Sequence, residues 1–441
     1  MPRLLLIQPS QYRGDGHTLV KQRRLHLPGL VFPLLAAMTP PHWEVKIALE
    51  VIDQIDYTWR PDLVGIGAMG HSIFRGMEIA REFRALGALV FFGGSMASLV
   101  PELLADVADS VVIGDAEIAF PQLLRDFEAG KGLQPVYHFP VDTLEGIPVP
   151  RYDLLLDKRI GDMLPVQAGR GCNHNCTFCS IAAIYKHRYL SRPIDDVLRD
   201  ITEVRALGFE KFLLIDDNII STPEYFLELC DAIAPLKMTW ASQCSISIAR
   251  DKRLLQAAAG SGCRILSFGI ETVQQEGLDA LKKQWMHAAE NEALLTKVAD
   301  AGILPSTEMM FGLDGDTEES IDETLQFVTR ARLPIPRFYI LTPIPGTELF
   351  DQYRHAGRLL HEDFQRYTGY QCVHEPHNIP SARLNDRYNR LNETVYSLPS
   401  IFRRTLCNPR ILRNPWAYTF AFFVNLHYHK HIRRHDIPVV F

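Results

Sequence analysis

The chain has 441 residues, of which 47% are hydrophobic and 22% are charged. This is the composition of a globular protein of roughly two to four domains, and it excludes a mainly disordered or low-complexity chain. With 46 Lys and Arg against 52 Asp and Glu, the net charge is −6. No excess of positive charge is available to bind a nucleic-acid backbone, so we expect no nucleic-acid partner.

The sequence shows neither a targeting signal nor a membrane span. The apolar run at residues 4–7 is too short for a signal peptide, and Gln8-Pro9-Ser10 follows it in place of a small-residue cleavage site, so we expect a cytoplasmic protein. The late apolar stretch from Trp416 to Leu426 falls short of the roughly 20 residues that a span needs. It favours a helix packed on the fold, and contact of this stretch and Arg403-Arg404 with a lipid surface or an apolar substrate is the alternative.

Short apolar runs alternate with helical patterns over the first 130 residues. Buried parallel strands are predicted at 4–7, 63–66, 88–92 and 110–113, and helices at 73–86 and 101–107. The later strands end in glycine or other small residues. This alternation predicts an α/β domain over residues 1–130, a doubly wound, Rossmann-like sheet whose ligand binds at the carboxyl ends of the strands.

A segment richer in Pro and Gly, residues 131–160, is predicted as a linker to a second α/β series. The strands of that series are expected at 164–168, 211–215, 238–242, 265–269, 305–311 and 337–341. The helices are expected at 194–207, 223–234, 252–260, 290–301 and 318–331. Six units are too few for a closed eight-stranded barrel, so residues 161–355 predict a partial (β/α)6 TIM-type barrel. Residues 356–441, with helical patterns at 384–396 and 411–424, are predicted as a C-terminal cap.

Three cysteines, Cys172, Cys176 and Cys179, lie within the glycine-rich stretch of residues 169–180. This stretch follows a predicted strand and precedes a helix, which places three thiolates on one loop at the edge of the barrel where barrel chemistry occurs. Iron–sulfur clusters are held by Cys thiolates, normally four for a 4Fe-4S cube. Three ligands would leave one iron open to a small chelating ligand.

A zinc site and incidental core cysteines are the alternatives for this loop. Zinc usually needs two Cys pairs or added histidines, and although His174 lies in the loop, no fourth ligand of suitable spacing follows. The other cysteines stand singly and favour buried free thiols: Cys230, Cys244, Cys263, Cys372 and Cys407. Four late histidines at i, i+2 spacing do not share a helix face, so we expect a solvated basic tail at His427, His429, His431 and His435.

The spacing Cys-x-x-x-Cys-x-x-Cys after a first barrel strand resembles that of the radical S-adenosylmethionine (SAM) superfamily. Four later strand ends resemble the motifs of its subgroup with an N-terminal cobalamin-binding domain: residues 214–218, 267–272, 311–317 and 341–347. In the front half, four stretches are similar to that domain: residues 36–40, 62–66, 92–95 and 112–117. The resemblance covers most of residues 1–400, and hopanoid C-2 methylases are among its nearest look-alikes.

The resemblance implies three cofactors, namely a 4Fe-4S cluster on Cys172, Cys176 and Cys179, SAM, and cobalamin. In such enzymes the reduced cluster splits SAM into methionine and a deoxyadenosyl radical, which removes a hydrogen atom from an unactivated carbon. In the methylating members, methylcobalamin gives its methyl group to that carbon, and a second SAM remethylates the cobalamin. An electron donor such as flavodoxin or ferredoxin is therefore an expected partner.

Polar residues at the barrel strand ends are the expected SAM contacts. Asp216 and Asp217 would accept hydrogen bonds from the SAM ammonium group, with a loop or helix cap as the alternative. Glu271 would accept from the ribose hydroxyls, with an internal ion pair as the alternative. Gln243 and Ser245 would face SAM or substrate. Gly312 would let the backbone approach SAM closely, unless it only forms a tight turn.

The expected cobalamin contacts lie at the strand ends of the front domain. They are Met69, Gly93, Gly94, Ser95 and Gly114, with plain strand-to-helix turns as the alternative. The Asp-x-His-x-x-Gly signature of His-ligated cobalamin proteins is not matched, because the nearest string, Asp15–Val20, ends in Val. We therefore expect His17 to be a loop histidine rather than an axial ligand, and a loss of cobalamin binding stays open.

The resemblance and the residues leave two alternative functions for this protein. The first is a cobalamin-dependent radical SAM methyltransferase acting on an sp3 carbon of a small-molecule or lipid-like substrate. The second is a radical SAM enzyme for cyclisation, oxidation or rearrangement, whose front domain uses cobalamin differently or not at all. A non-catalytic cobalamin or iron–sulfur sensor is a third class, and the three-cysteine loop argues against it because a sensor needs no open iron.

Overall fold

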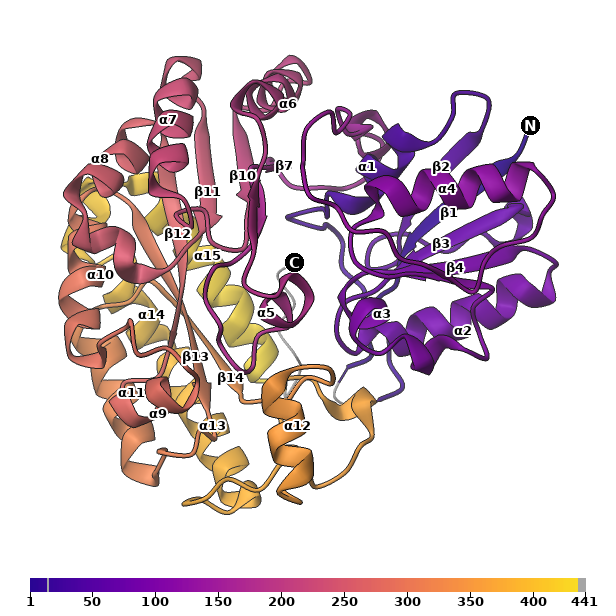
Figure 1. Ribbon diagram of the computed structural model, residues 1–441. Coiled ribbons are helices and arrows are strands. Elements are labelled where there is room, and N and C mark those ends of the chain that lie inside the picture. The colour runs from indigo at the N-terminus through magenta and orange to yellow at the C-terminus, as the bar shows by residue number, and fades with distance from the viewer. Residues whose placement is uncertain (14–15, 435–441) are drawn as a thin grey trace. The chain divides into compact units, whose positions relative to one another are not determined.

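The computed structural model describes residues 1–13 and 16–434. The chain folds into two compact units and forms two six-stranded parallel sheets (Figure 1). Among the described residues, the first unit takes in those of Met1–Gln167 and Leu190–Glu210, and the second takes in Ala168–Tyr189 and residues 211–434. The expected order of two α/β folds along the chain is confirmed.

The first sheet has the strand order β2-β1-β3-β4-β5-β6, with every neighbouring pair parallel. Its strands are β1 (Arg3–Gln8), β2 (Glu44–Leu49), β3 (Leu63–Gly67), β4 (Leu89–Gly93), β5 (Ser110–Val112) and β6 (Val136–Tyr137). Residues 4–7 of β1 are all buried, because helices cover both faces of the sheet. These helices are α1 (Val31–Met38), α2 (Ser72–Ala85), α3 (Ser95–Leu99) and α4 (Ala116–Glu128). The direction of strand succession reverses between β1 and β3, which is where such sheets bind ligands.

Some elements of this unit differ from expectation. The helix expected at residues 101–107 is a short 3-10 turn over Pro101–Leu104, because the chain already turns at residues 105–107 ahead of β5. Strand β2 was not predicted, since Glu44 and Lys46 interrupt its apolar run. The segment predicted as a linker, 131–160, contributes the two-residue strand β6 to the sheet. The predicted domain boundaries themselves stay a prediction.

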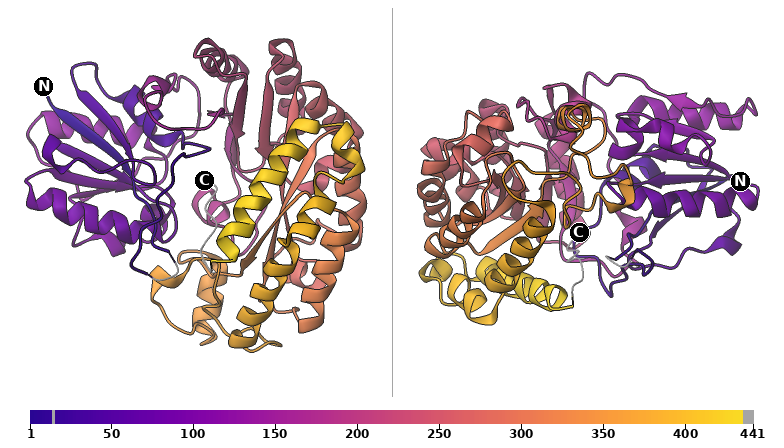
Figure 2. Two further views of the ribbon diagram at one scale, coloured as in Figure 1. Left: turned by 180° about the vertical axis from the view of Figure 1, so that it is seen from behind. Right: turned by 90° about the horizontal axis from the view of Figure 1, so that it is seen from below.

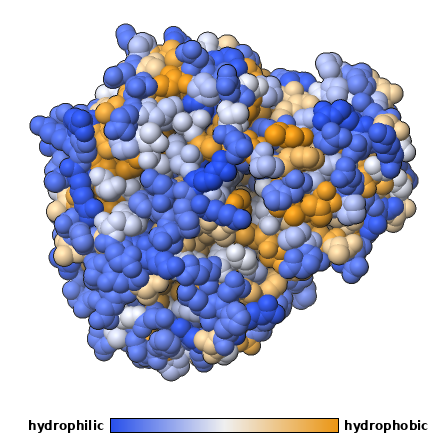
Figure 3. Space-filling view, in the orientation of Figure 1, coloured by the Kyte–Doolittle hydropathy of each residue, from blue (hydrophilic) through white to orange (hydrophobic). Residues whose placement is uncertain are grey.

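The second sheet has the order β14-β13-β12-β11-β10-β7. Its strands are β7 (Leu164–Gln167), β10 (Lys211–Ile215), β11 (Thr239–Gln243), β12 (Cys263–Glu271), β13 (Leu304–Phe311) and β14 (Ile335–Ile340). All six were predicted to within a few residues. The intervening helices are α6 (Ile194–Ala206), α7 (Pro223–Ile233), α8 (Lys252–Gly260), α9 (Gln275–Ala280), α10 (Asn291–Asp300) and α11 (Glu318–Arg330). The partial (β/α)6 barrel is confirmed, and its outer helices α9 and α11 present a mostly hydrophilic face (Figure 3).

The C-terminal region is helical, as predicted. It contains α12 (Glu348–His355), α13 (Ser381–Val395), α14 (Leu398–Arg404) and α15 (Pro415–Ile432). Figure 2 shows α15, in yellow, beside the second sheet. Ala417, Tyr418 and Ala421 of α15 pack with Leu304 and Ile335, so packing on the fold is confirmed for this side of the helix. No helix among the described residues is long and apolar enough to cross a membrane.

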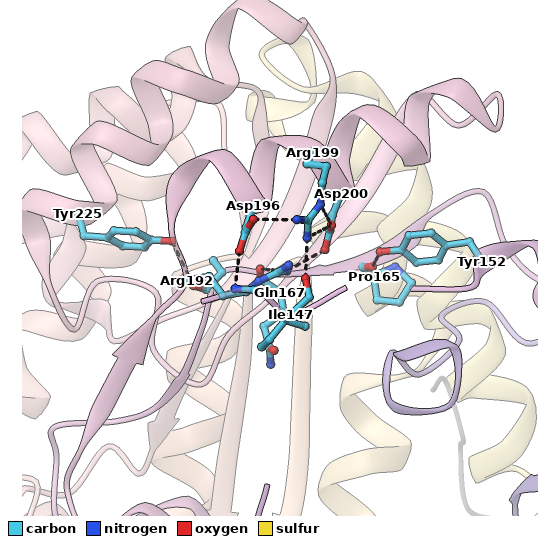
Figure 4. A network of polar contacts seen from close by, with 11 residues as sticks. Ile147, Tyr152, Pro165, Gln167, Arg192, Asp196, Arg199, Asp200 and Tyr225 are labelled. Atoms are coloured by element: carbon cyan, nitrogen blue, oxygen red, sulfur yellow. Dashed lines mark hydrogen bonds and ion pairs between the residues drawn. The ribbon is translucent and has the colours of Figure 1, made fainter. Parts of the chain in front are cut away.

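A buried ion pair between Arg192 and Asp200 connects helix α6 to the end of β7 (Figure 4). Arg192 donates from Nη1 to Asp200 Oδ2 at 2.8 Å and to the carbonyl of Gln167 at 3.1 Å, and both charged side chains are 1% exposed. Arg199 donates from Nη2 to Asp200 Oδ1 at 3.2 Å and to the carbonyl of Ile147 at 2.7 Å. Helix α6 is thereby tied to the end of β7 and to the chain that precedes it.

We predict that Asp200→Ala destabilises the protein by about 3–5 kcal/mol, because it leaves a buried guanidinium without its counter-charge. The matched control is Arg151→Ala, which breaks an ion pair with Asp153 whose side chains are 47% and 52% exposed and costs less than about 1 kcal/mol. Thermal unfolding of the two variants measures the difference. Equal shifts in melting temperature would contradict the assignment of the Arg192–Asp200 pair as a structural anchor.

Candidate active site

The three predicted ligands lie on the loop between β8 (Gly169–Gly171) and α5 (Ser180–Tyr185). Cys172, Cys176 and Cys179 are free and partly exposed. The loop starts at Gly171, whose φ is +83° and where a Cβ atom would overlap the carbonyl of Arg188, so only glycine fits there. At mid-loop, the Thr177 N–H donates to the carbonyl of Leu281 at 3.3 Å, and the Thr177 carbonyl accepts from the Leu349 N–H at 2.9 Å. The loop is therefore held by two other segments of the chain.

The donor chemistry of this loop fits an iron–sulfur cluster. Burial raises the pKa of all three thiols and that of Cys176 to about 12, so cluster binding would have to displace their protons. No three His, Cys, Asp or Glu side chains within residues 1–13 and 16–434 converge as ligands of one metal ion. A cluster of several iron atoms needs thiolates on different irons rather than such a convergent set. Three soft thiol donors on one held loop match that requirement.

A buried ion pair lies beside the loop. The Lys283 Nζ donates to Glu271 Oε1 at 2.6 Å and to the carbonyl of Gly269 at 3.0 Å, and the Lys283 and Glu271 side chains are each 7% exposed. Burial by itself would lower the pKa of Lys283, but Glu271 and the thiols of Cys176 and Cys179 raise it. The internal ion pair that was the alternative for Glu271 is thus present. Contact of Glu271 with SAM stays a prediction.

The end of β10 contacts the start of the cysteine loop. Asp217 Oδ2 accepts from the N–H of Gly171 at 2.7 Å. Asp216 Oδ1 accepts from the N–H of Asn218 at 2.9 Å, and Asn218 Oδ1 in turn accepts from the N–H of Ser245 at 3.0 Å. The side chain of Asn218 also opposes the burial that raises the pKa of the Cys172 thiol. The end of β10 is therefore joined to the start of the cysteine loop through Asp217, and to the residues after β11 through Asn218, which sequence reasoning had not singled out.

Asp216 is a buried carboxyl group with an unusual pKa. Its side chain accepts a hydrogen bond from the Tyr189 hydroxyl at 2.7 Å. Burial raises the pKa of Asp216 to about 8, although the hydrogen bonds from Tyr189 and from the backbone oppose this rise. A buried carboxyl that is neutral at pH 7 is ready to accept a cationic ligand, which would ionise it.

The remaining predicted SAM contacts are Gln243, Ser245 and Gly312, and they differ in their contacts within the protein. Gln243 ends β11 with an exposed side chain, and Ser245 Oγ lies 2.6 Å from Ser247 Oγ. The N–H of Gly312 donates to Asp316 Oδ2 at 2.8 Å, and its carbonyl accepts from His374 Nε2 at 2.9 Å. The N–H and the carbonyl of Gly312 are thus both hydrogen-bonded within the protein. The tight turn at Gly312 therefore has a structural reason. These three SAM contacts stay predictions.

Sequence reasoning missed a polar group on the barrel strands. Arg337 in β14 donates from Nη2 to Ser267 Oγ in β12 at 2.8 Å and to Glu308 in β13 at 2.5 Å. Gly269 is two residues after Ser267 and so shares its face of β12, and a Cβ there would lie 3.3 Å from Lys283 Nζ. The face of β12 that carries Ser267 therefore also borders Lys283, which lies beside the cysteine loop. A charged residue inside each of two buried strands, Glu308 in β13 and Arg337 in β14, was the signal that could have revealed this group.

The front unit brings its predicted residues to the carboxyl edge of its sheet. Met69 lies in the loop after β3 with a side chain that is 78% exposed, and Gly93 ends β4. Gly94 and Gly114 have φ values of +100° and +74°. Ser98 Oγ donates to the Gly94 carbonyl and accepts from the Gly114 N–H, both at 2.9 Å, and so joins the loops after β4 and β5. Ser98 was not predicted.

Gly94 has a structural reason of its own. A Cβ atom there would lie 2.9 Å from the carbonyl oxygen of Ala68, and the positive φ disfavours any other residue. Ser95 begins α3, directly after this turn. A bulky residue at Gly94 would therefore disturb the fold as well as a ligand, whereas Met69 is exposed and has no such constraint. Cobalamin contact by these residues stays a prediction.

Three expectations outside the site have mixed outcomes. Cys230, Cys244, Cys263 and Cys372 are buried free thiols, but the prediction is wrong for Cys407, which is exposed. The predicted basic tail is wrong for His427, His429 and His431, which lie partly buried on α15 because this helix runs on to Ile432. His435 lies outside the described residues. His17 is exposed, in keeping with a loop histidine.

A family model described as "Radical SAM superfamily" matches residues 166–328. A bacteriochlorophyllide d C-8(2)-methyltransferase of Chlorobaculum tepidum is 28% identical over 398 residues, covering 86% of this chain and 88% of the relative. The hopanoid C-2 methylase of Rhodopseudomonas palustris is 23% identical and covers 82% and 72%. An anaerobic magnesium-protoporphyrin IX monomethyl ester cyclase of Rubrivivax gelatinosus is also 23% identical and covers 82% and 68%.

Two solved structures share the fold. The radical SAM methyltransferase TsrM of Kitasatospora setae, with cobalamin and a [4Fe-4S] cluster bound, superposes with a TM-score of 0.66 at 19% identity and covers 81% of this chain and 78% of its own. The cobalamin-dependent SAM radical enzyme OxsB, with aqua-cobalamin bound, has a TM-score of 0.69 at 12% identity and covers 98% and 72%. The resemblance drawn from the sequence is confirmed: residues 166–328 match the radical SAM superfamily model, and the chain shares the fold of cobalamin-binding radical SAM enzymes.

Proposed function

We propose that this protein is a cobalamin-dependent radical SAM methyltransferase that methylates an sp3 carbon of a small-molecule or lipid-like substrate. The observation that carries the proposal is a held loop with three free thiols beside a buried acid at the end of β10, in a chain that also has a doubly wound front unit. The methyltransferase relatives and the two cobalamin-containing structures support it.

Cys172, Cys176 and Cys179 would hold a 4Fe-4S cluster and leave one iron for SAM. When bound, the cluster would supply the electron that cleaves SAM, and the cobalamin would supply the methyl group that is transferred. Asp216 would take the SAM ammonium group. Lys283 places a fixed positive charge next to the thiols and orients Glu271. Each of these side chains is already hydrogen-bonded in place, so little reorganisation is needed on binding.

The polar group of Ser267, Glu308 and Arg337 would orient the substrate or the methionine end of SAM. Arg337 offers a guanidinium that suits carboxylates, and Glu308 offers an acceptor for hydroxyl or amino groups. In the front unit, Met69, Gly93, Gly94, Ser95 and Gly114 would border the corrin at the carboxyl edge of the sheet. An electron donor such as flavodoxin or ferredoxin and a cytoplasmic location belong to the same proposal.

A second candidate is radical chemistry without methyl transfer, which the cyclase relative favours. The two candidates differ in the fate of a labelled methyl group. With SAM labelled in its methyl group and with cobalamin, a methyltransferase passes the label to cobalamin and forms S-adenosylhomocysteine. An enzyme of the second kind forms 5′-deoxyadenosine without S-adenosylhomocysteine.

We predict that Cys172→Ala, Cys176→Ala and Cys179→Ala each abolish the iron–sulfur absorbance and SAM cleavage, because loss of one of three ligands leaves the cluster unanchored. Cys407→Ala, which removes an exposed thiol outside the loop, should retain both. Iron content, the visible spectrum and 5′-deoxyadenosine formation after anaerobic reconstitution give the answer. Wild-type turnover in any loop variant would refute the proposed cluster site.

We predict that SAM binding weakens as the pH falls from 7.5 to 6.0. The pKa of Asp216 is about 8, so at a lower pH its carboxyl group is protonated and neutral in the SAM-free protein. Binding of an ammonium group then requires the loss of this proton. The affinity should fall more than about tenfold over this interval. Equilibrium binding to the reconstituted protein measures it, with Asp216→Asn as the variant that loses the pH dependence. A wild-type affinity that does not change with pH would show that Asp216 does not meet the ammonium group.

We predict that the protein binds one cobalamin per chain and that His17→Ala does not change this. Met69→Glu should reduce cobalamin binding, because it puts a charge on an exposed side chain at the expected corrin site. Leu86→Glu is the matched control, since Leu86 is 37% exposed at the opposite end of α2. The corrin absorbance of the purified complexes reports the occupancy. If the wild-type protein takes up no cobalamin, the methyltransferase proposal fails and the second candidate replaces it.

A further inference from the structure

The segment Thr394–Arg434 differs in charge from the rest of the chain. It contains seven Lys and Arg residues and no Asp or Glu. Removing these seven charges from the net charge of −6 leaves −13 for the rest of the chain. So strong an asymmetry on an acidic protein indicates a surface that meets an anionic partner.

Three of the seven cationic side chains make hydrogen bonds or ion pairs within the protein. Arg404 is buried and donates to the carbonyls of Leu333 and Val395 at 2.7 and 2.9 Å. Arg410 and Arg413 pair with Asp300 at 2.8 and 3.4 Å. The other four are exposed and have no ion-pair partner in the described part of the chain: Arg403, Lys430, Arg433 and Arg434. Their charges are therefore available to a partner.

Apolar side chains that face solvent accompany these free cations. Phe402 of α14 is 43% exposed and Phe423 of α15 is 62% exposed. Both adjoin Phe422, at ring-centroid distances of 5.1 and 5.6 Å. Leu398, 44% exposed, lies one turn before Phe402 on α14, and Trp416, 36% exposed, lies two turns before Phe423 on α15. We call these five residues the C-terminal aromatic face.

The C-terminal aromatic face is separate from the packed side of α15. Ala417, Tyr418 and Ala421 of this helix are buried against the barrel. The helix is therefore apolar on its outer side as well, where a helix at the surface of a soluble protein carries polar residues. Leu398 and Arg433 line one crevice of about 320 Å³, which Glu393 also borders, so an apolar and a cationic side chain meet at the edge of the face.

We propose that the C-terminal aromatic face docks this protein on a bilayer surface rich in anionic lipid. Aromatic and Leu side chains beside Lys and Arg, in a segment whose residues 394–434 include no Asp or Glu, are typical of a helix that lies in the interface rather than spanning the membrane. Arg403, Lys430, Arg433 and Arg434 pair with lipid phosphates, and Phe402 and Phe423 enter the headgroup region. This inference goes beyond the proposed methyl transfer and holds for any reaction of the active site.

The test is co-sedimentation of the full-length protein with vesicles, either of phosphatidylcholine alone or with one third of phosphatidylglycerol. We expect binding to the anionic vesicles only, weakened by high salt. Arg403→Glu should weaken binding by about fivefold or more, the factor for one cation at an anionic surface. Phe423→Glu should abolish it. Both residues are exposed, so the variants should keep the wild-type melting temperature.

The matched controls are Leu360→Glu, which changes an apolar residue that is 46% exposed outside the face, and Arg253→Glu, which reverses a cation on α8 that is 76% exposed. Both should bind vesicles as the wild type does. The proposal is overturned if the wild-type protein stays in the supernatant, or if Phe423→Glu binds as the wild type does. It is also overturned if the wild type ignores vesicles but forms a dimer that Phe423→Glu dissociates, which would make the face an interface between copies of this chain.

Discussion

The burial of parallel strands is the constraint on which the rest of this structure depends. Parallel sheets are stable when helices cover both faces, so each strand returns through a helix and all carboxyl ends meet at one edge. In the second unit, that edge carries the cysteine loop, Asp216, Ser245 and Glu271, although they are far apart in the sequence. The site is thus a consequence of strand direction, and polar residues gather where the apolar runs stop.

Bringing charges to that edge has a cost that the structure offsets by pairing them. Lys283 and Glu271 are both buried and bind one another, and Asp216 keeps its proton through a pKa of about 8. A buried charge without a partner costs several kcal/mol, so such groups persist only where they are paired or neutralised. Paired groups next to three thiols form a site whose electrostatics are set before any cofactor arrives.

The glycines show why a motif alone does not identify a ligand contact. Gly94 lies close to the backbone of Ala68, and both backbone groups of Gly312 are bonded within the chain. Each glycine therefore has a sufficient structural reason, whether or not a cofactor lies near. Exposed side chains at the same edge, such as Met69 and Gln243, are better markers, because the fold makes no use of them.

The sequence by itself determined the two α/β folds, the six barrel strands and the three-cysteine loop, because apolar runs and ligand spacing are local properties of the chain. Only the tertiary structure decided that Lys283 pairs with Glu271, that Asn218 joins the end of β10 to Ser245, and that Arg337 meets Glu308. It also decided that α15 packs with one side and exposes Phe423 on the other. Such contacts join residues distant in the chain, and no local pattern records which side chains will meet.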